Sequence, residues 1–408
     1  MVTKRLWAIT GLAISLGMAQ ANAETLESYA QRLAEHPQVA RILEQSTRFE
    51  ELSDGEMGLP DPQIIFGAEN VPINSPAFDR FLPTSKVLGI RQQIPSYSLR
   101  KARSSKQESL AKRQNLVADY TRKRLEAILI GQLAELDKVK TLERLAGEQL
   151  ELYRAMEEDM QGRLEAGNPV YGRFSEIDVD RAGVEQHLND LKVERVAIEE
   201  ELVRLVGEVP SIPFPSVPEI TWNRNGTALY PVRIAAEDVQ VATKDVDVAD
   251  AAFDPTYGVQ ATYKQRESGA GFSGDDWLSV QATVSIPLWA TSNQKPKLRA
   301  AQAGRRSAKY AYEDVRREWV GRMATLKAER NVTLDNIALL QEKASALREK
   351  TEAAERDYES GNTSLESVLE TQIDALTIAA QLAEQRSRHV RLSARFNSHI
   401  VEEHHESN

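Results

Sequence analysis

The chain has 408 residues, with 51 basic and 61 acidic side chains and a formal net charge of −10. A mean hydropathy of −0.45 excludes a polytopic helical membrane protein, which needs several apolar runs of about 20 residues. The absence of cysteine excludes disulfide scaffolds, thiolate metal sites and cysteine nucleophiles. The acidic balance also argues against nucleic acid as a partner, because neutralising phosphates needs a basic face.

The first residues have the pattern of a secretory signal peptide. Lys4 and Arg5 give a positive start, residues 6–18 form an apolar core, and Ala21-Asn22-Ala23 supplies a small-x-small cleavage site. We therefore expect residues 1–23 to be removed on export from a bacterial cytoplasm. A buried N-terminal helix is the alternative interpretation.

The positions of the prolines predict where long helices lie. No proline occurs in residues 96–168, 170–209 or 297–408, and a proline inside a helix costs roughly 3 kcal/mol. Apolar stripes at helical spacing support this, namely Leu125, Leu129, Leu133, Leu136 and Val139, then Leu188, Leu191, Ile198, Leu202 and Leu205. Such narrow seams on charged helices are typical of coiled-coil packing. A run of about 70 residues would span about 100 Å, although a simple structural coiled coil would show the same pattern.

Four segments near the prolines alternate between apolar and polar residues, which predicts β-strands. They lie around residues 64–68, 88–94, 257–263 and 278–286. A strand of about 8 to 10 residues with one apolar face fits a tilted transmembrane strand, although ordinary sandwich strands are the alternative. Aromatic residues cluster near the strand ends, at Phe78, Phe81, Tyr97, Trp277 and Trp289. Four strands cannot close a barrel, and open edges are costly in lipid, so a membrane role would require oligomerisation.

Short motifs recur in the same order about 193 residues apart and predict an internal two-fold repeat. Asp61-Pro62 returns as Asp254-Pro255, and Glu165-Ala166-Gly167-Asn168 returns as Glu359-Ser360-Gly361-Asn362. We predict a first repeat over 24–209, with a hairpin at 62–95 and helices at 96–209, and a linker at 210–230. The second repeat would cover 231–400, with a hairpin at 255–287 and helices at 294–400, before a polar tail at 401–408.

Two sets of residues carry a family resemblance. A turn glycine followed by a Leu-x-x-Val-Leu-acid run occurs at 361–370, and its first-half counterpart is Gly167-Asn168 followed by residues 174–179. Leu59-Pro60-Asp61-Pro62-Gln63 precedes Glu69-Asn70-Val71-Pro72. Over essentially the whole mature chain, the sequence resembles the TolC-like family of outer-membrane efflux factors, and most of all its CzcC-like heavy-metal branch.

The resemblance implies a fold and a function. The fold would be mostly α with a small β part: long coiled-coil hairpins forming an α-barrel, plus four transmembrane strands per protomer. A homotrimer would then build a 12-stranded barrel in outer-membrane lipid, continued by a periplasmic tunnel. The protein would be a passive channel for heavy-metal cations, working with a periplasmic adaptor and an inner-membrane pump. Efflux of drugs or small organic compounds is the alternative within the family, and a soluble coiled-coil adaptor is the alternative outside it.

The resemblance also implies site residues near the tips of the helical hairpins. Glu370 matches one acidic gate position of the family, whereas the other falls on Ser367, with Glu366 beside it. A ring of Glu370 from three protomers would attract cations, although a solvated helix glutamate is an equal alternative. Gly167, Asn168, Gly361 and Asn362 suit helix reversal, and the resemblance adds a role in contacting the adaptor.

The sequence contains no pattern that predicts an enzyme or a bound cofactor. Nucleophile elbows, phosphate loops, zinc-ligand helices and dinucleotide fingerprints are all missing from it. His399, His404 and His405 lie beside Glu402 and Glu403 and are weak candidates for binding a metal. A disordered polar tail is the simpler interpretation of this segment.

Overall fold

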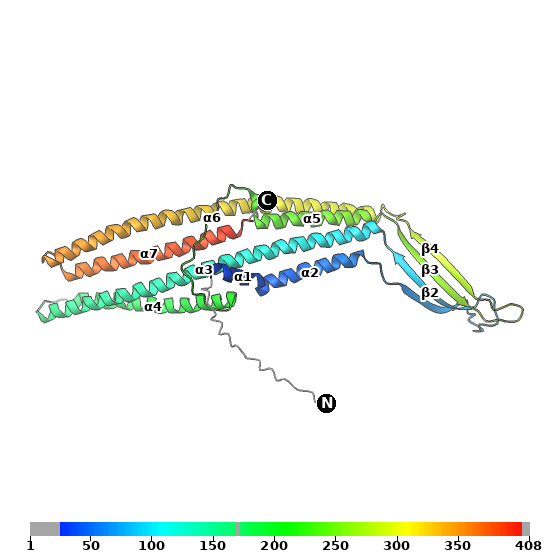
Figure 1. The fold of residues 1–408 in the computed structure, drawn as a ribbon, viewed down its shortest axis with the longest axis horizontal. Helices are drawn as coiled ribbons and strands as arrows, with labels where there is room; N and C mark the ends of the chain where they lie inside the picture. Colours follow the sequence, from blue (N-terminus) through cyan, green and yellow to red (C-terminus); the bar gives the residue numbers. More distant parts are fainter. Residues whose placement is uncertain (1–24, 169–170, 402–408) are drawn as a thin grey trace, which may run out of the picture.

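The computed structural model describes residues 25–168 and 171–401. The molecule is elongated, with a small sheet at one end and two helical tips at the other (Figure 1). Long helices run between these two ends, and the prediction of a mostly helical chain with a small antiparallel sheet is confirmed. The predicted signal peptide, His404 and His405 lie outside the described residues.

The chain passes twice through the same order of elements: a helix, a β-hairpin, a very long helix and a shorter returning helix. The first pass consists of α1 (Leu26–Arg32), the 3₁₀ turn η1 (Leu33–Glu35), α2 (Pro37–Met57), β1 (Gln63–Glu69), β2 (Ser85–Ile94), α3 (Tyr97–Glu165) and α4 (Tyr171–Val206). The second consists of the 3₁₀ turn η2 (Gly226–Ala228), α5 (Tyr230–Ala251), β3 (Thr256–Gln265), β4 (Trp277–Ser285), α6 (Gln294–Glu359) and α7 (Leu365–Ser398).

The helix boundaries follow from local sequence. α2 begins at Pro37, whose ring fixes a helical φ and whose missing N–H would be unpaired there anyway. The Ser96 side chain accepts a hydrogen bond from the Leu99 N–H at the start of α3, and Ser364 does the same for Ser367 at the start of α7. α3 has 69 residues, so it is about 100 Å long.

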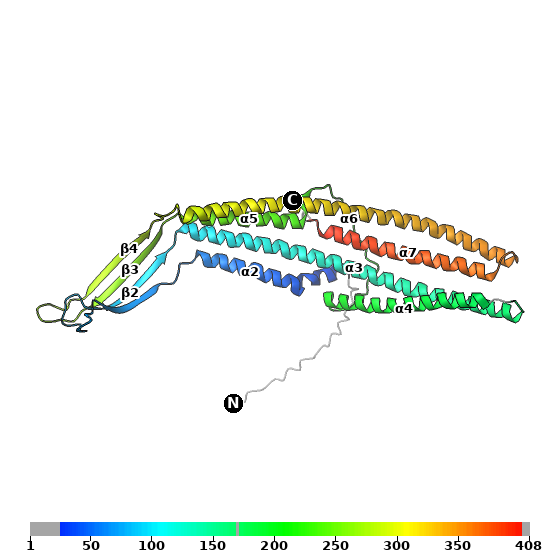
Figure 2. The same ribbon diagram turned by 180° about the vertical axis from the view of Figure 1, so that it is seen from behind.

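The helices form one curved layer with α3 near its middle (Figure 2). In the half nearer the sheet, α3 packs on α2 and α5, and in the half nearer the tips it packs on α4 and α7. α6 packs along α5 and then along α7. The lateral edges of the layer are therefore α6 on one side and α2 with α4 on the other.

The predicted apolar seams lie in the core. All five residues of the α3 stripe are buried, as are Leu191, Ile198, Leu202 and Leu205 of α4, whereas Leu188 is only half-buried. A second cluster joins the linker before α5 to α6 and α7 through Trp222, Leu229, Met323 and Phe396. A third holds the tips together and includes Met156, Met160, Ile177 and Leu369.

The four strands form one antiparallel sheet in the order β1-β2-β3-β4. The two hairpins meet at β2 and β3, where Ile90 lies opposite Ala261. Within the described ranges, β1 and β4 each have a neighbour on one side only. None of the helices in these ranges combines the length and apolarity that crossing a membrane requires.

Candidate functional site

One face of the sheet is apolar across all four strands. Directly opposite residues of an antiparallel pair share a face, so the register aligns Phe66, Leu88, Tyr263 and Leu278 in one row. Ile64, Ile90, Ala261 and Val280 form the next row. Phe66 is 84% exposed and Leu278 is 73% exposed. An apolar surface of this extent marks an interaction site with an apolar medium or partner.

The opposite face of the sheet is largely polar. Arg91 donates to the Gln260 side chain at 2.7 Å, and Lys264 pairs with Glu69. Serine, threonine and glutamine residues of β4 occupy the same face, at Ser279, Gln281 and Thr283. The predicted alternation is thus confirmed as one apolar and one largely polar face.

The loops beyond the strands are joined by a buried arginine. The Arg266 guanidinium lies 3.9 Å from the centre of the Trp277 ring and donates to the carbonyl oxygens of Asp275 and Leu82 at 2.7 and 3.2 Å. This side chain therefore connects the two hairpin loops within one protomer. At the other end of the sheet Trp289 is exposed, so large aromatic side chains lie at both ends.

The two helical tips have the same turn geometry. Gly167 and Gly361 have φ values of 91° and 77°, in the left-handed region that favours glycine. The Asn168 N–H donates to the Arg163 carbonyl at 3.0 Å, and the Asn362 N–H donates to the Asp357 carbonyl at 2.8 Å. Both turns are Schellman motifs. The predicted helix reversal at these glycines is confirmed, and all four predicted tip residues are exposed.

An arginine that sequence reasoning missed brings the predicted acidic gate residues together. Arg173, near the start of α4, donates through Nε to Glu366 at 2.5 Å and through a terminal nitrogen to Glu370 on α7. Its other terminal nitrogen contacts Glu176 at 2.7 Å. Ser367 lies between the two paired glutamates in sequence, but its backbone N–H bonds Ser364 at the helix start.

The pairing changes the electrostatics expected of the gate. Glu366 and Glu370 have 22% and 52% exposed side chains, so the first is partly shielded and the second is open to water. The bond to Glu176, with the charges of Glu366 and Glu370, raises the pKa of Arg173 above its usual range and keeps it charged. Each carboxylate is therefore partly neutralised within its own protomer.

The offset between the recurring motifs gives one sequence signal for this cluster. Arg173 and Glu366 are 193 residues apart, the same offset as the recurring motifs, and Glu176 and Glu370 are 194 apart. The cluster therefore joins positions separated by this offset, within the first two turns of α4 and α7. Residues at matching positions with opposite charge are candidates for an ion pair.

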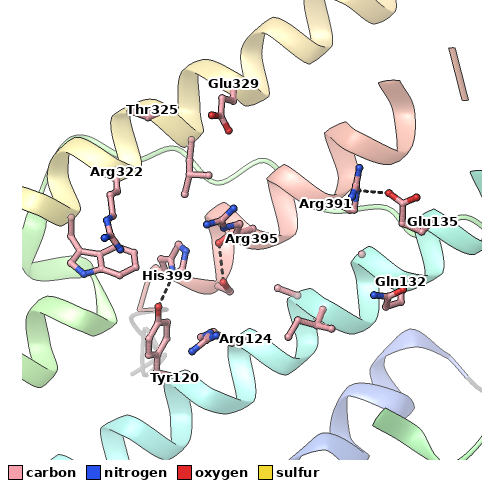
Figure 3. Close-up of a pocket in the computed structure, with 16 residues that line it drawn as sticks. Tyr120, Arg124, Gln132, Glu135, Arg322, Thr325, Glu329, Arg391, Arg395 and His399 are labelled. Carbon is pink, nitrogen blue, oxygen red and sulfur yellow. Dashed lines mark hydrogen bonds and ion pairs between the residues drawn. The ribbon is translucent and has the colours of Figure 1, made fainter. Parts of the chain in front are cut away.

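His399 lies in surroundings that do not favour a metal cation. The side chain is 7% exposed and its Nδ1 lies 2.9 Å from the Tyr120 hydroxyl (Figure 3). Burial, with the charges of Arg395, Arg124 and Arg322, lowers its pKa to about 4. Over the ranges that the structure describes, no three His, Cys, Asp or Glu side chains are grouped as metal ligands.

The outer edges of the helix layer carry apolar stripes. On α6, Tyr310, Val332 and Leu339 are exposed and fall on one face at 100° per residue, roughly opposite the buried Met323 and Arg330. On α4, the exposed valines lie opposite its buried seam, at Val179, Val193, Val196 and Val203. Both edges therefore present apolar side chains to the surroundings of the protomer.

Solved structures identify the fold as one found in outer-membrane proteins. VceC from Vibrio cholerae has a TM-score of 0.71 at 17% identity, over 91% of this chain and 95% of that chain. CusC, described in terms of transmembrane channel formation, has a TM-score of 0.74 at 12% identity over 91% of each chain. The Campylobacter jejuni outer membrane channel CmeC has a TM-score of 0.70 at 12% identity, over 98% of this chain and 95% of that chain.

A family model agrees with this fold. Residues 232–395, from the start of α5 to near the end of α7, match the family described as Outer membrane efflux protein. Comparison with curated protein sequences gives no match. The likeness to these solved structures covers at least 91% of the chain, whereas the family match covers only residues 232–395.

Proposed function

We propose that this chain is one protomer of a homotrimeric outer-membrane channel, the exit duct of a tripartite efflux system. The apolar sheet face carries the proposal, because Phe66, Leu88, Tyr263 and Leu278 are aligned and face outwards at one end of an elongated molecule. Water would not stabilise that surface, whereas lipid would. The fold likeness and the family match support the same function.

Trimerisation would satisfy the open edges of the protomer. In lipid, the unpaired backbone groups of β1 and β4 would be costly, and pairing β4 with β1 of the next copy in a ring of three would close a 12-stranded barrel. The α6 stripe would meet α2 and α4 of the neighbouring copy in the same ring. This is a heterologous contact that closes by rotation, and the two apolar stripes support it.

The remaining predicted parts fit this assembly. We propose that residues 1–23 direct export, that residues 24–209 and 231–400 are the two repeats, and that the helices form a periplasmic tunnel. The exposed tips at Gly167, Asn168, Gly361 and Asn362 would contact the adaptor. Energy would come from the inner-membrane pump, because the channel itself would be passive.

The ion cluster of Arg173 supports a gate at the tips. We propose that Glu366, Ser367 and Glu370 line the tunnel constriction and that Arg173 holds the start of α7 against the start of α4. Arg173→Gln should free both carboxylates and raise single-channel conductance in planar bilayers, because partly exposed ion pairs hold about 0.2–1 kcal/mol each. The increase should be larger in dilute than in concentrated salt.

A matched control uses an ion pair away from the tip cluster. Arg154 contacts Glu151 at 2.7 Å on the exposed surface of α3, so Arg154→Gln removes a similar bond. An equal conductance change in both variants would contradict a gating role for Arg173.

We propose heavy-metal cations as the cargo, on the resemblance of residues 59–63 and 69–72 to the CzcC-like branch. His404 and His405 stay weak candidates for metal contacts in that proposal, whereas the arginines around His399 argue against a metal there. Organic cargo is the second candidate. A cavity lined by Arg124, Arg322, Arg391 and Arg395 favours it, because its positive charge would repel metal cations. A deletion strain should lose resistance to divalent metals if the first proposal holds, and to organic compounds if the second does.

Fractionation tests the channel itself against the soluble adaptor. We expect the protein in the outer-membrane fraction, extracted only by detergent as a trimer that dissociates on heating. Recovery of the protein from the periplasm without detergent would overturn the channel proposal.

A further inference from the structure

A cavity of about 910 Å³ lies between α3, α6 and α7, where α7 ends (Figure 3). Pockets of roughly 300–1,000 Å³ hold small organic ligands, so the volume suits one. The cavity lies far along the helices from both the strands and the tips, and none of the predicted gate or tip residues lines it.

The charge of the cavity is opposite to that of the whole chain. Four arginines and two glutamates line it, a net charge of +2 with histidine neutral, whereas the chain carries −10. The arginines come from three helices: Arg124 from α3, Arg322 from α6, and Arg391 with Arg395 from α7. Convergence of positive charge from separate elements favours an anionic ligand.

Only part of this positive charge is neutralised. Arg391 contacts Glu135 at 2.6 Å, and Arg322 contacts Glu318 at 2.5 Å. Arg124 and Arg395 form no ion pair with any residue that the structure describes, and both are exposed. These two guanidinium groups are therefore available to bind a carboxylate or phosphate, which they match in geometry.

The lining of the cavity also includes apolar and aromatic surface. Trp319, Leu326 and Ile128 line it, and the His399 ring lies 4.8 Å from the Trp319 ring. Burial, with the charges of Arg395, Arg124 and Arg322, lowers the pKa of His399, so this histidine is neutral at neutral pH and adds no cationic charge. The site thus combines an apolar wall with two guanidinium groups that form no ion pair with a described residue, although Arg124 also lies over the Tyr120 ring.

We propose that this cavity binds a small aromatic carboxylate, with the carboxylate held by Arg124 and Arg395 and the ring packed against Trp319 and Leu326. A divalent cation is excluded by the positive charge, and a neutral compound would leave the guanidinium groups without a partner. The proposal does not depend on the channel function, because it concerns binding to a single protomer.

Fluorescence of Trp319 provides the test in the full mature chain in detergent. The probe is 4-nitrobenzoate, which quenches tryptophan, with benzoate as a non-quenching competitor and 4-nitrobenzamide as the neutral analogue. We expect saturable quenching by 4-nitrobenzoate that benzoate reverses and that Trp319→Phe removes. The amide should show only the linear quenching of partition into detergent.

Variants of exposed arginines separate the site from general charge effects. R124Q/R395Q should weaken 4-nitrobenzoate binding about tenfold or more, because hydrogen bonds to charged groups are lost. R386Q is the matched control, since Arg386 is exposed on α7 two and a half turns from Arg395 and does not line the cavity. Unchanged binding by R124Q/R395Q, equal binding of the amide, or no benzoate-reversible quenching would each overturn the proposal.

Discussion

The two long helices occupy equivalent places in the two halves of the chain, yet their surroundings differ. α3 has 69 residues and α6 has 66, but α3 buries 18 of them and α6 buries four. α3 has helices on both sides along its whole length, whereas α6 has α5 and α7 on one side. The difference comes from position in the layer, because one helix is central and the other is at an edge.

The face of α6 that has no neighbouring helix carries apolar side chains. A helix with no partner on one side normally has polar residues there, but α6 presents Tyr310, Val332 and Leu339, and Leu339 is 63% exposed. The exposed stripe on α6 therefore supports the proposed trimer, in which a further copy of the chain lies along that edge.

The largest expected effect is the loss of the proposed trimer on charging this edge. Val332→Glu combined with Leu339→Glu would place carboxylates on the apolar stripe, where burying them without partners is strongly unfavourable. We expect monomers by size-exclusion chromatography with light scattering in detergent. Ser345→Glu adds one carboxylate at an exposed position on another face of α6 and should leave the trimer intact. Trimers in the double variant would show that the stripe is not an interface.

The next largest effect is a loss of stability when a buried side chain of the central helix α3 is truncated. Leu129 of α3 is fully buried, and Leu129→Ala should lower the free energy of unfolding by about 2–5 kcal/mol because it leaves a cavity. Guanidinium denaturation followed by circular dichroism measures this. Leu43→Ala on α2, where the side chain is partly exposed, should cost less than half as much. Similar losses in both variants would contradict a central core along α3.

A pH effect is expected at His399, which contacts Tyr120 of α3 and Trp319 of α6. Its pKa is about 4 in the folded chain, against an ordinary 6.5, so protons bind the unfolded state first. Above pH 6.5 His399 is neutral in both states and does not change the free energy of unfolding. Between pH 6.5 and 4 the proton binds the unfolded state preferentially, so the free energy of unfolding falls by up to about 3 kcal/mol.

The His399→Gln variant isolates this contribution. Its melting temperature should fall less than that of the wild type between pH 7 and 4.5. His187→Gln, at an exposed position of α4, should follow the wild-type profile. Identical profiles for wild type and His399→Gln would contradict the assignment.

The smallest effect compares the two tips. Gly167→Ala and Gly361→Ala should each cost about 1 kcal/mol, because alanine is strained at positive φ, although a Cβ would meet no atom within 4 Å at either position. Gly147→Ala inside α3 should instead stabilise by about 0.5–1 kcal/mol. Thermal melts of the three variants check the order. A cost at one tip only would show that the two turns are not equivalent.

Local sequence patterns predicted the elements of this fold well. The Leu125 to Val139 stripe, the four alternating strands and the glycine turns each depend on neighbours within a few residues, so periodicity and turn chemistry identify them. The alternation also restricts the strand register, because a shift of one residue would invert both faces, but the register itself comes from the structure.

Contacts between distant helices were not predictable in the same way. The motif offset makes Arg173 and Glu366 one candidate pair, but charged residues are so common on these helices that the offset yields many such pairs. Selecting this one requires knowledge of how α4 and α7 approach each other. Arg124, Arg322 and Arg395 likewise converge only because α7 ends beside α3 and α6. Each of these arginines looks like an ordinary exposed helix residue in the sequence.

The connection between β2 and α3 has a mechanical consequence. Only two residues separate Ile94 from Tyr97, whereas eight separate Ser285 of β4 from Gln294 of α6. A helix about 100 Å long and joined so tightly to the sheet acts as a lever, so a tilt of about 2° at the strands would displace its far end by about 3–4 Å. A change at the sheet would thus reach the tip through α3 as a movement the width of a side chain.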